Sequence, residues 1–146
     1  MIVKEAMTAD AAWVDAGRTI GEAAQLMLKL DVGCMPVTEG DRLVGLITDR
    51  DIACRAVAEG RNPYAERVRA IMSEKVVCCS ENQPLEEAVE LMEANGIRRL
   101  PVLDQNGHIA GLISIDDIAR HADYQLTGQL MHFLCMPAEK RPLRRV

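Results

Sequence analysis

Gly45-Leu46-Ile47-Thr48-Asp49-Arg50-Asp51-Ile52 decides the fold of this chain of 146 residues, because the stretch occurs twice. The second copy is Gly111-Leu112-Ile113-Ser114-Ile115-Asp116-Asp117-Ile118. Each copy opens with an apolar run typical of a strand and reaches a hydroxyl residue of the kind that begins helices. The same strand-to-helix turn is therefore predicted in both halves of the chain.

Segments around these stretches repeat in the same order. Val3–Met7 returns at residues 68–72, Glu22–Met27 at 87–92 and Met35–Val37 at 100–102. Such a doubled unit predicts tandem repeats related by a pseudo-twofold axis, with related clefts where the halves meet. We place the first repeat at residues 1–62 and the second at 63–122. A C-terminal helix and a basic tail occupy residues 123–146.

Hydrophobic periodicity predicts an α/β unit in each copy. A helical turn at residues 2–7 leads into residues 11–14, and the β-rich run at 76–79 is the second copy's counterpart. Strands are expected at 32–37 and 97–103, followed by hairpin strands at 43–47 and 109–113. Apolar residues at helical spacing predict one amphipathic helix per copy, and these are Ile20, Ala23, Ala24, Met27 and Leu28, then Leu85, Ala88, Val89 and Met92.

Composition indicates a cytoplasmic globular protein and argues against nucleic acid or membrane as partners. The net charge is −5 and only 3% of the residues are aromatic, which leaves little basic or stacking surface for nucleic acid. No apolar run approaches the length of a membrane span, and we find no signal-peptide core. Five cysteines, an odd number, favour free thiols in a reducing compartment.

The two predicted helix starts place a hydroxyl three residues before a carboxylate. Thr48 precedes Asp51, and Ser114 precedes Asp117. A helix N-terminus favours a phosphate, the hydroxyl can donate to it, and the carboxylate can accept from ribose hydroxyls. The same pattern is also a helix capping box, in which hydroxyl and carboxylate satisfy the backbone. Both interpretations stay open, and they can coexist.

The repeated Met-Pro-Val and Leu-Pro-Val pieces, together with the two strand-to-helix stretches, resemble the cystathionine-β-synthase (CBS) domain family. The resemblance covers residues 2–122 and is closest to the small bacterial type with a tandem pair of CBS domains, or Bateman module. It implies β-α-β-β-α units that pack sheet to sheet and commonly form a disc-shaped homodimer. It also implies an adenosine-containing ligand such as AMP, ADP, ATP, NAD or S-adenosylmethionine between the repeats.

Site residues follow from the resemblance. The strand before the proline lines the nucleotide cleft in the family, which points to Met35 and Pro36 in one copy and to Pro101 in the other. Because proline cannot donate to a sheet ladder, we expect both prolines at strand ends or edges. The adenine wall of the second site corresponds to Val77, Cys78 and Ile97.

Charged residues make the two copies unequal. Arg98 and Arg99 suit the phosphates of a polyphosphate, or else are solvated charges at a strand edge. At the positions of these two arginines the first copy has Gly33 and Cys34. Immediately before its acid the first copy has Arg50, where the second copy has Asp116. We therefore expect unequal sites, with the second copy better equipped for phosphate.

Trp13 and the C-terminal segment each allow two interpretations. Trp13 aligns with Cys78, so it either belongs to the core or enters the cleft, where it stacks on a base or plugs the site. Residues 124–136 carry Leu126, Leu130, Phe133 and Leu134 at helical spacing, which predicts a helix packed on the module, on a second subunit or on an effector protein. The basic tail is a solvated terminus or a docking segment.

The sequence gives little support for a metal site, a redox sensor or an enzyme. His132 and Cys135 form a single pair of potential zinc ligands, and Cys78 and Cys79 point to opposite faces of a strand, which disfavours a redox sensor. No histidine stands where it could activate a nucleophile and no glycine-rich phosphate loop is present, so we expect no enzyme.

The sequence thus predicts a regulatory, energy-sensing module without catalytic residues or metal. Its nucleotide would change the arrangement of repeats or subunits and so signal to a partner. The alternative is an interaction scaffold that binds no ligand and works through its C-terminal helix and disc surface.

Overall fold

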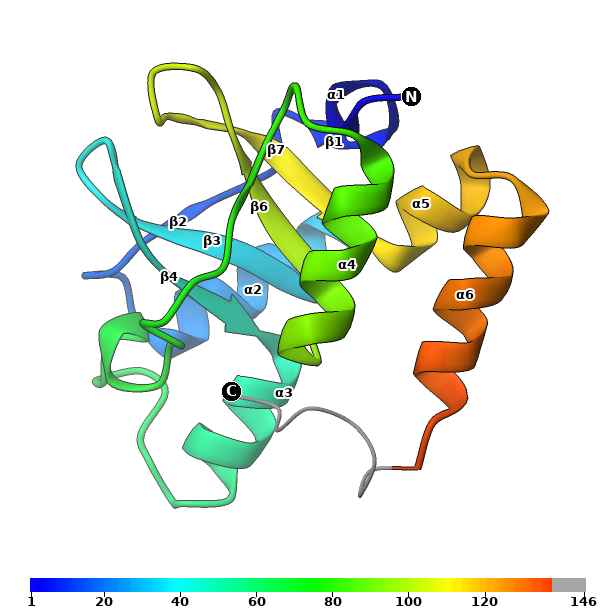
Figure 1. Ribbon diagram of the computed structural model, residues 1–146. Coiled ribbons are helices and arrows are strands. Elements are labelled where there is room, and N and C mark those ends of the chain that lie inside the picture. Colours follow the sequence, from blue (N-terminus) through cyan, green and yellow to red (C-terminus); the bar gives the residue numbers. More distant parts are fainter. Residues whose placement is uncertain (138–146) are drawn as a thin grey trace. The chain divides into compact units, whose positions relative to one another are not determined.

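The fold contains two β-sheets in a computed structural model that describes residues 1–137 (Figure 1). One sheet has the strand order β2-β3-β4, and the other has the order β1-β7-β6-β5. The mixed α/β class expected from the sequence is confirmed. The basic tail at residues 138–146 lies outside the described residues.

The chain forms two compact units, whose limits differ from those of the sequence repeats. Residues 12–76 form one, which we call the continuous unit. Residues 1–11 join residues 77–137 in the other, which we call the split unit. The segment that opens each repeat is therefore built into the unit that contains the rest of the other repeat.

The continuous unit begins with β2 (Val14–Asp15), which runs parallel to β3 (Cys34–Glu39), and β3 pairs antiparallel with β4 (Arg42–Thr48). Helix α2 (Ile20–Leu30) connects β2 to β3. The short helix α3 (Asp49–Asp51) follows β4 and continues as a π-helix, η1 (Ile52–Val57). A 3₁₀ turn, η2 (Val68–Ala70), lies near the unit's end.

Helix α2 forms where capping and periodicity both predict a helix. The Thr19 hydroxyl accepts from the Glu22 amide at 3.1 Å, and the Glu22 carboxylate accepts from the Thr19 amide at 2.9 Å. This capping box satisfies two amides that the first turn leaves without helical partners. Ile20, Ala23 and Met27 are buried, as predicted, but Leu28 is 85% exposed and does not belong to the core face.

The split unit contains α1 (Val3–Ala6) and β1 (Thr8–Ala9) from the start of the chain. Its remaining elements are β5 (Cys79–Ser80), α4 (Leu85–Asn95), β6 (Arg99–Leu103), β7 (Ile109–Ser114), α5 (Ile115–His121) and α6 (Tyr124–Cys135). The β-rich run expected at residues 76–79 pairs only at its end, because the ladder to β6 begins at Cys79.

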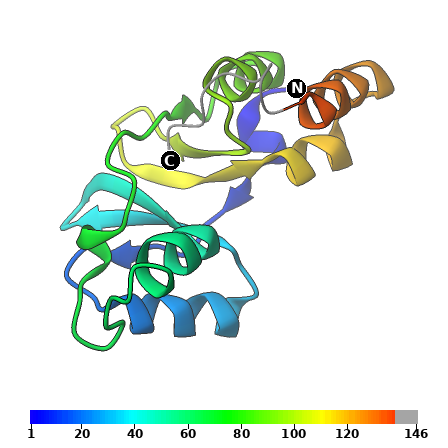
Figure 2. The ribbon, with the colours of Figure 1, turned by 90° about the horizontal axis from the view of Figure 1, so that it is seen from below.

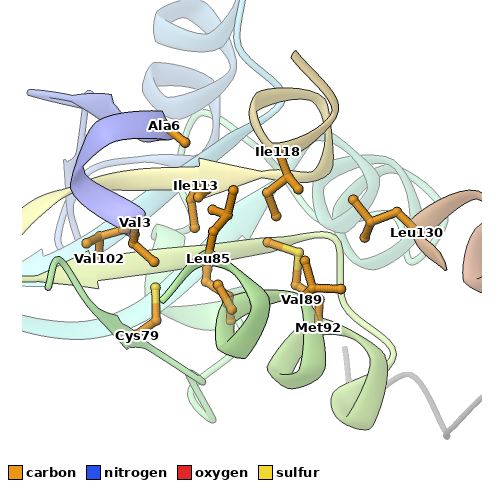
Figure 3. Packing of buried hydrophobic residues seen from close by; sticks show 12 residues of the cluster. Val3, Ala6, Cys79, Leu85, Val89, Met92, Val102, Ile113, Ile118 and Leu130 are labelled. Atoms are coloured by element: carbon orange, nitrogen blue, oxygen red, sulfur yellow. The ribbon is translucent and has the colours of Figure 1, made fainter. Parts of the chain in front are cut away.

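The core of the split unit is assembled from both parts of its sequence (Figure 3). Val3 from α1 is completely buried with Leu85, Val89 and Met92 from α4 and Ile113 from β7. Every apolar position predicted for α4 is therefore confirmed as core. Helix α6 packs on α4 and α5, and its Leu130 and Phe133 are buried, which confirms a helix docked on the module.

A reciprocal exchange of opening segments shapes both units. Strand β1 pairs antiparallel with β7 through Thr8 and Leu112, as Figure 2 shows for the short strand beside β7. In the continuous unit, Ser73 pairs in the same way with Leu46, through backbone hydrogen bonds of 2.9 and 3.0 Å. The same exchange of an opening segment therefore occurs in both units.

The hairpin between β6 and β7 turns at the predicted Asn106-Gly107 pair. Gly107 has a φ of +81°, which glycine adopts readily, and the Asp104 carboxylate accepts from the amides of Asn106 and His108. Among residues 1–137, no helix is both long and apolar enough to cross a membrane.

Candidate ligand-binding site

In the continuous unit, the β4-to-α3 turn buries a carboxylate. Asp51 is 2% exposed, and its Oδ2 accepts from the Thr48 amide at 2.9 Å. The Thr48 hydroxyl in turn accepts from the Asp51 amide at 3.1 Å. The two residues therefore form the capping box that was one of the two sequence interpretations.

The remaining amides of α3 are also occupied. The Asp49 amide donates to the Gly33 carbonyl at 3.0 Å, and the Arg50 amide donates to the Asp49 side chain at 2.8 Å. An anion could reach these amides only by displacing protein acceptors. The expected phosphate role of this helix start is thereby weakened, whereas the acid next to it remains a candidate.

The split unit repeats this geometry with Ser114 and Asp117. Asp117 Oδ2 accepts from the Ser114 amide at 2.9 Å and from the Ser114 hydroxyl at 2.6 Å, while the Asp117 amide donates to that hydroxyl at 3.2 Å. Asp117 Oδ1 accepts from the Thr8 hydroxyl at 3.4 Å and from the Arg120 guanidinium. Both oxygens of this acid therefore have donors from the protein itself.

Pro36 and Pro101 lie inside β3 and β6 and not at strand ends, but each precedes the residues that pair with the neighbouring parallel strand, which agrees with the expected alternative of an edge position. Pro36 faces Leu46 on β4, and both backbone groups of Leu46 bond to Ser73 on the opposite side. The proline nitrogen thus lies toward β2, which pairs with β3 only at Val37 and Thr38. No ladder bond is lost, because the pairing of β2 begins only at Val37, and the backbone of Met35 pairs with Ile47 on β4.

The backbones of Arg98 and Arg99 lie next to the start of α5. Arg99 is half-buried and pairs with Ser114 across the β6–β7 ladder. Arg98 is exposed, and its carbonyl accepts from the Ile115 amide at 3.1 Å. In the first copy, Arg50 is exposed on α3. Backbone pairing thus brings Arg99 and Ser114 together.

Two half-buried residues of the expected adenine wall, Val77 and Ile97, pack against the core of the split unit. Cys78 is also half-buried, and burial raises the pKa of its thiol. Burial, together with the neighbouring Cys78, raises the pKa of Cys79 to about 12. Both thiols are therefore protonated at neutral pH, which makes them poor nucleophiles for redox chemistry.

Trp13 is not a core residue, because its side chain is 57% exposed. It immediately precedes β2, whose Val14 pairs with Val37. In this parallel register Trp13 flanks the part of β3 that contains Pro36. The interpretation of Trp13 as core was wrong, and the single tryptophan lies beside β3, just before β2.

Three residues that contact the acids were missed by the sequence reasoning. Arg55 and Arg120 follow Asp51 and Asp117 by four and three residues, so helical spacing could have revealed both. Thr8 lies 109 residues from Asp117 and carries no local signal. Its role depends on the exchange of opening segments.

A comparison with protein families identifies the repeat. The sequence profile of the CBS domain matches residues 3–56 and again residues 68–124. The chain belongs to the CBS domain family. The CBS domain-containing protein YhcV of Bacillus subtilis is 44% identical over 117 residues, which are 80% of this chain and 82% of that protein.

Solved CBS structures share the fold. The CBS domain pair of protein MJ0100, crystallised with 5′-methylthioadenosine and S-adenosyl-L-methionine, aligns with a TM-score of 0.74 and 27% identity over 82% of this chain and 94% of that chain. Hypoxic Response Protein I, with two coordinated zinc ions, aligns with a TM-score of 0.76 and 30% identity over 84% and 100% of the two chains. Within residues 1–137 of this chain, no three potential ligands gather to hold a metal.

Proposed function

We propose that this CBS protein is a regulatory module that binds an adenosine-containing ligand. The observation that carries the proposal is a buried carboxylate that accepts from a backbone amide at the start of the helix after each hairpin. A carboxylate in this position accepts from the two hydroxyls of a ribose. The complex of MJ0100 with two adenosine derivatives supports this ligand class for the fold.

The exposed Trp13, next to the part of β3 that contains Met35 and Pro36, adds a second feature of a binding site. The indole ring of Trp13 offers a stacking surface to a planar base. We propose that the ligand lies between this part of β3 and the acid of the following helix.

The module acts by binding and not by catalysis. A ligand shifts the arrangement of repeats or subunits only by its different affinity for the two arrangements. We expect AMP, ATP, NAD or S-adenosylmethionine as candidates, a homodimer as the working form, an effector protein as the reader and the cytoplasm as the location. Apolar side chains such as Leu28 and Val57, 85% and 70% exposed, are available for such an interface.

A thermal-shift panel with AMP, ADP, ATP, NAD, S-adenosylmethionine and 5′-methylthioadenosine tests the proposal. A ligand at 100 times its dissociation constant adds about 2.7 kcal/mol to the free energy of unfolding. GTP serves as the matched control for a purine nucleotide with another base. If no adenosine compound raises the melting temperature, the sensing function is refuted and the interaction scaffold takes its place.

A further inference from the structure

Helix α6 has an apolar stripe on the side that faces away from its own unit. The helix packs on α4 and α5 (Figure 1), and its buried Leu130 and Phe133 mark the packed side. Four exposed residues follow one another on the opposite side at helical spacing, and we call them the outer stripe: Tyr124, Gly128, Met131 and Cys135. Tyr124 is 97% exposed, and Met131 is 54% exposed.

Gly128 is not explained by the fold of a single chain. It lies inside α6 without a positive φ, and a Cβ atom at this position would meet nothing within 4 Å. A glycine inside a helix costs about 0.5–1 kcal/mol relative to alanine. Neither a turn nor a close contact among residues 1–137 requires this glycine. A helix of another chain that approaches closely at Gly128 would require it.

The charges of α6 do not oppose the association of two copies. No Asp, Glu, Lys or Arg occurs from Tyr124 to Pro137, although 27% of the residues in the chain are charged. The solvent side of a helix on a globular protein is typically charged or polar. The centres of protein interfaces, in contrast, are depleted of charge and enriched in Tyr and Met. Two copies of α6 therefore meet without repulsion between like charges.

The outer stripe is complementary to itself about one point. Large and small residues alternate along it, in the order Tyr124, Gly128, Met131 and Cys135. When two copies of α6 lie antiparallel about a two-fold axis at the middle of the stripe, Tyr124 faces Cys135 of the second copy. Gly128 then faces Met131 of the second copy. The midpoint of the first pair is also the midpoint of the second pair, so a single two-fold axis sets a small residue against each large one.

We propose that two copies of this chain associate through the outer stripes of antiparallel α6 helices. The proposal rests on the proposed function for the homodimer, whose contact it names, and does not depend on the ligand. A helix of 12 residues is about 18 Å long, so one crossing buries less than the roughly 800 Å² per partner of a standard interface. The dimer held by this contact should therefore dissociate on dilution.

Sedimentation velocity of the full chain over a range of concentrations tests the proposal. The average mass of the wild-type protein should rise from one chain toward two. Gly128→Met should weaken association about tenfold or more, because it sets a second large side chain against Met131 of the other copy. It should leave α6 folded, since Met favours a helix more than Gly does. The matched control Gln125→Met adds the same side chain to the exposed part of α6 outside the stripe and should leave association unchanged.

Exchange of the two central residues distinguishes a second copy from any other partner. The double variant Gly128→Met with Met131→Gly again sets a large residue against a small one across the two-fold axis, so it should restore most of the affinity that Gly128→Met loses. Its helix contains the same residue types as the wild-type helix, so helix propensity does not account for the recovery. The inference is wrong if Gly128→Met leaves association unchanged, or if the double variant associates no better than the single one.

Alkylation of two exposed thiols provides a readout on the wild-type chain. Cys135 belongs to the outer stripe, whereas Cys54 lies on η1 of the continuous unit. Iodoacetamide should modify Cys135 more slowly as the chains associate and should modify Cys54 at a constant rate, as measured by mass spectrometry of peptides. Protection of Cys54 without protection of Cys135 overturns the inference. A protein that stays monomeric at every concentration refutes the inference and the proposed homodimer, while the thermal-shift panel decides adenosine binding separately.

Discussion

Two glycines permit the close approach of exchanged segments. In the continuous unit, a Cβ atom on Gly45 would lie 2.7 Å from the Met72 sulfur and 2.9 Å from the Ser73 carbonyl oxygen. In the split unit, a Cβ on Gly111 would overlap the Thr8 carbonyl. Both glycines begin a copy of the repeated stretch, so the absence of a side chain at this position is part of the fold.

Gly45→Ala should therefore lower the free energy of unfolding by about 1–3 kcal/mol, the range for overpacking against backbone that cannot move away. Gly128→Ala is the matched control, because its Cβ meets nothing and it lies in α6. It should stabilise the protein by about 0.5–1 kcal/mol. Urea denaturation measures both, and equal effects would show that Ser73 does not restrain β4.

The helices that follow the two hairpins differ although their sequences correspond. After Asp51 the backbone continues as π-helix η1, whereas α5 is a regular α-helix. Arg55 lies in η1 and donates to the carbonyl oxygens of Ile71 and Met72, just before the exchanged residue Ser73. π-Helical turns often occur at functional sites, and this one directly follows Asp51.

Helix α6 is stabilised by one apolar face. Leu130 is 2% exposed and belongs to the core of the split unit, while Met131 is 54% exposed on the same helix. Leu130→Ala should lower the free energy of unfolding by about 2–5 kcal/mol through the cavity that it leaves. Met131→Ala should change it by less than about 0.5 kcal/mol.

Circular dichroism during urea unfolding measures this pair of variants. If Leu130→Ala left stability intact, α6 would not be part of the core. Binding of a second subunit to the exposed side would appear instead as a change in oligomeric state in Met131→Ala, measured by light scattering.

At the scale of the molecule, each opening segment stabilises the other repeat. Val3 is completely buried in the core of the split unit, and Val68, its counterpart in the second repeat, is completely buried in the core of the continuous unit. The hydrogen bonds agree, because the Val3 amide donates to the Gln83 carbonyl and the Val68 amide donates to the Arg18 carbonyl.

Val3→Ala should consequently loosen α4 and β6, although residue 3 is far from them in sequence. Val68→Ala should loosen α2 and β3. Each loss of buried side chain should cost about 1.5–3 kcal/mol. Hydrogen exchange measured by mass spectrometry distinguishes the units, and the exchange of segments is refuted if Val3→Ala lowers protection in α2 and β3 instead.

Much of the architecture was determined by sequence patterns within a few residues. The capping boxes at Thr19, Thr48 and Ser114, the buried stripe of α4 and the Asn106-Gly107 turn depend on neighbours three or four positions away. Local hydrogen bonds and helical periodicity can be predicted from such spacing. Because these patterns occur twice in the same order, the sequence also indicated the CBS family.

Tertiary structure alone decided how the repeats share their segments and which acid has an oxygen without a hydrogen-bond donor. Thr8 reaches Asp117 only because β1 pairs with β7, and Asp51 Oδ1 has no corresponding donor. The exposure of Trp13 likewise depends on where the neighbouring strands end. So does the position of Pro36 inside β3 and not at its end. Hydrogen bonds and burial between residues far apart in the chain form only when the backbone brings them together, so no local pattern encodes them.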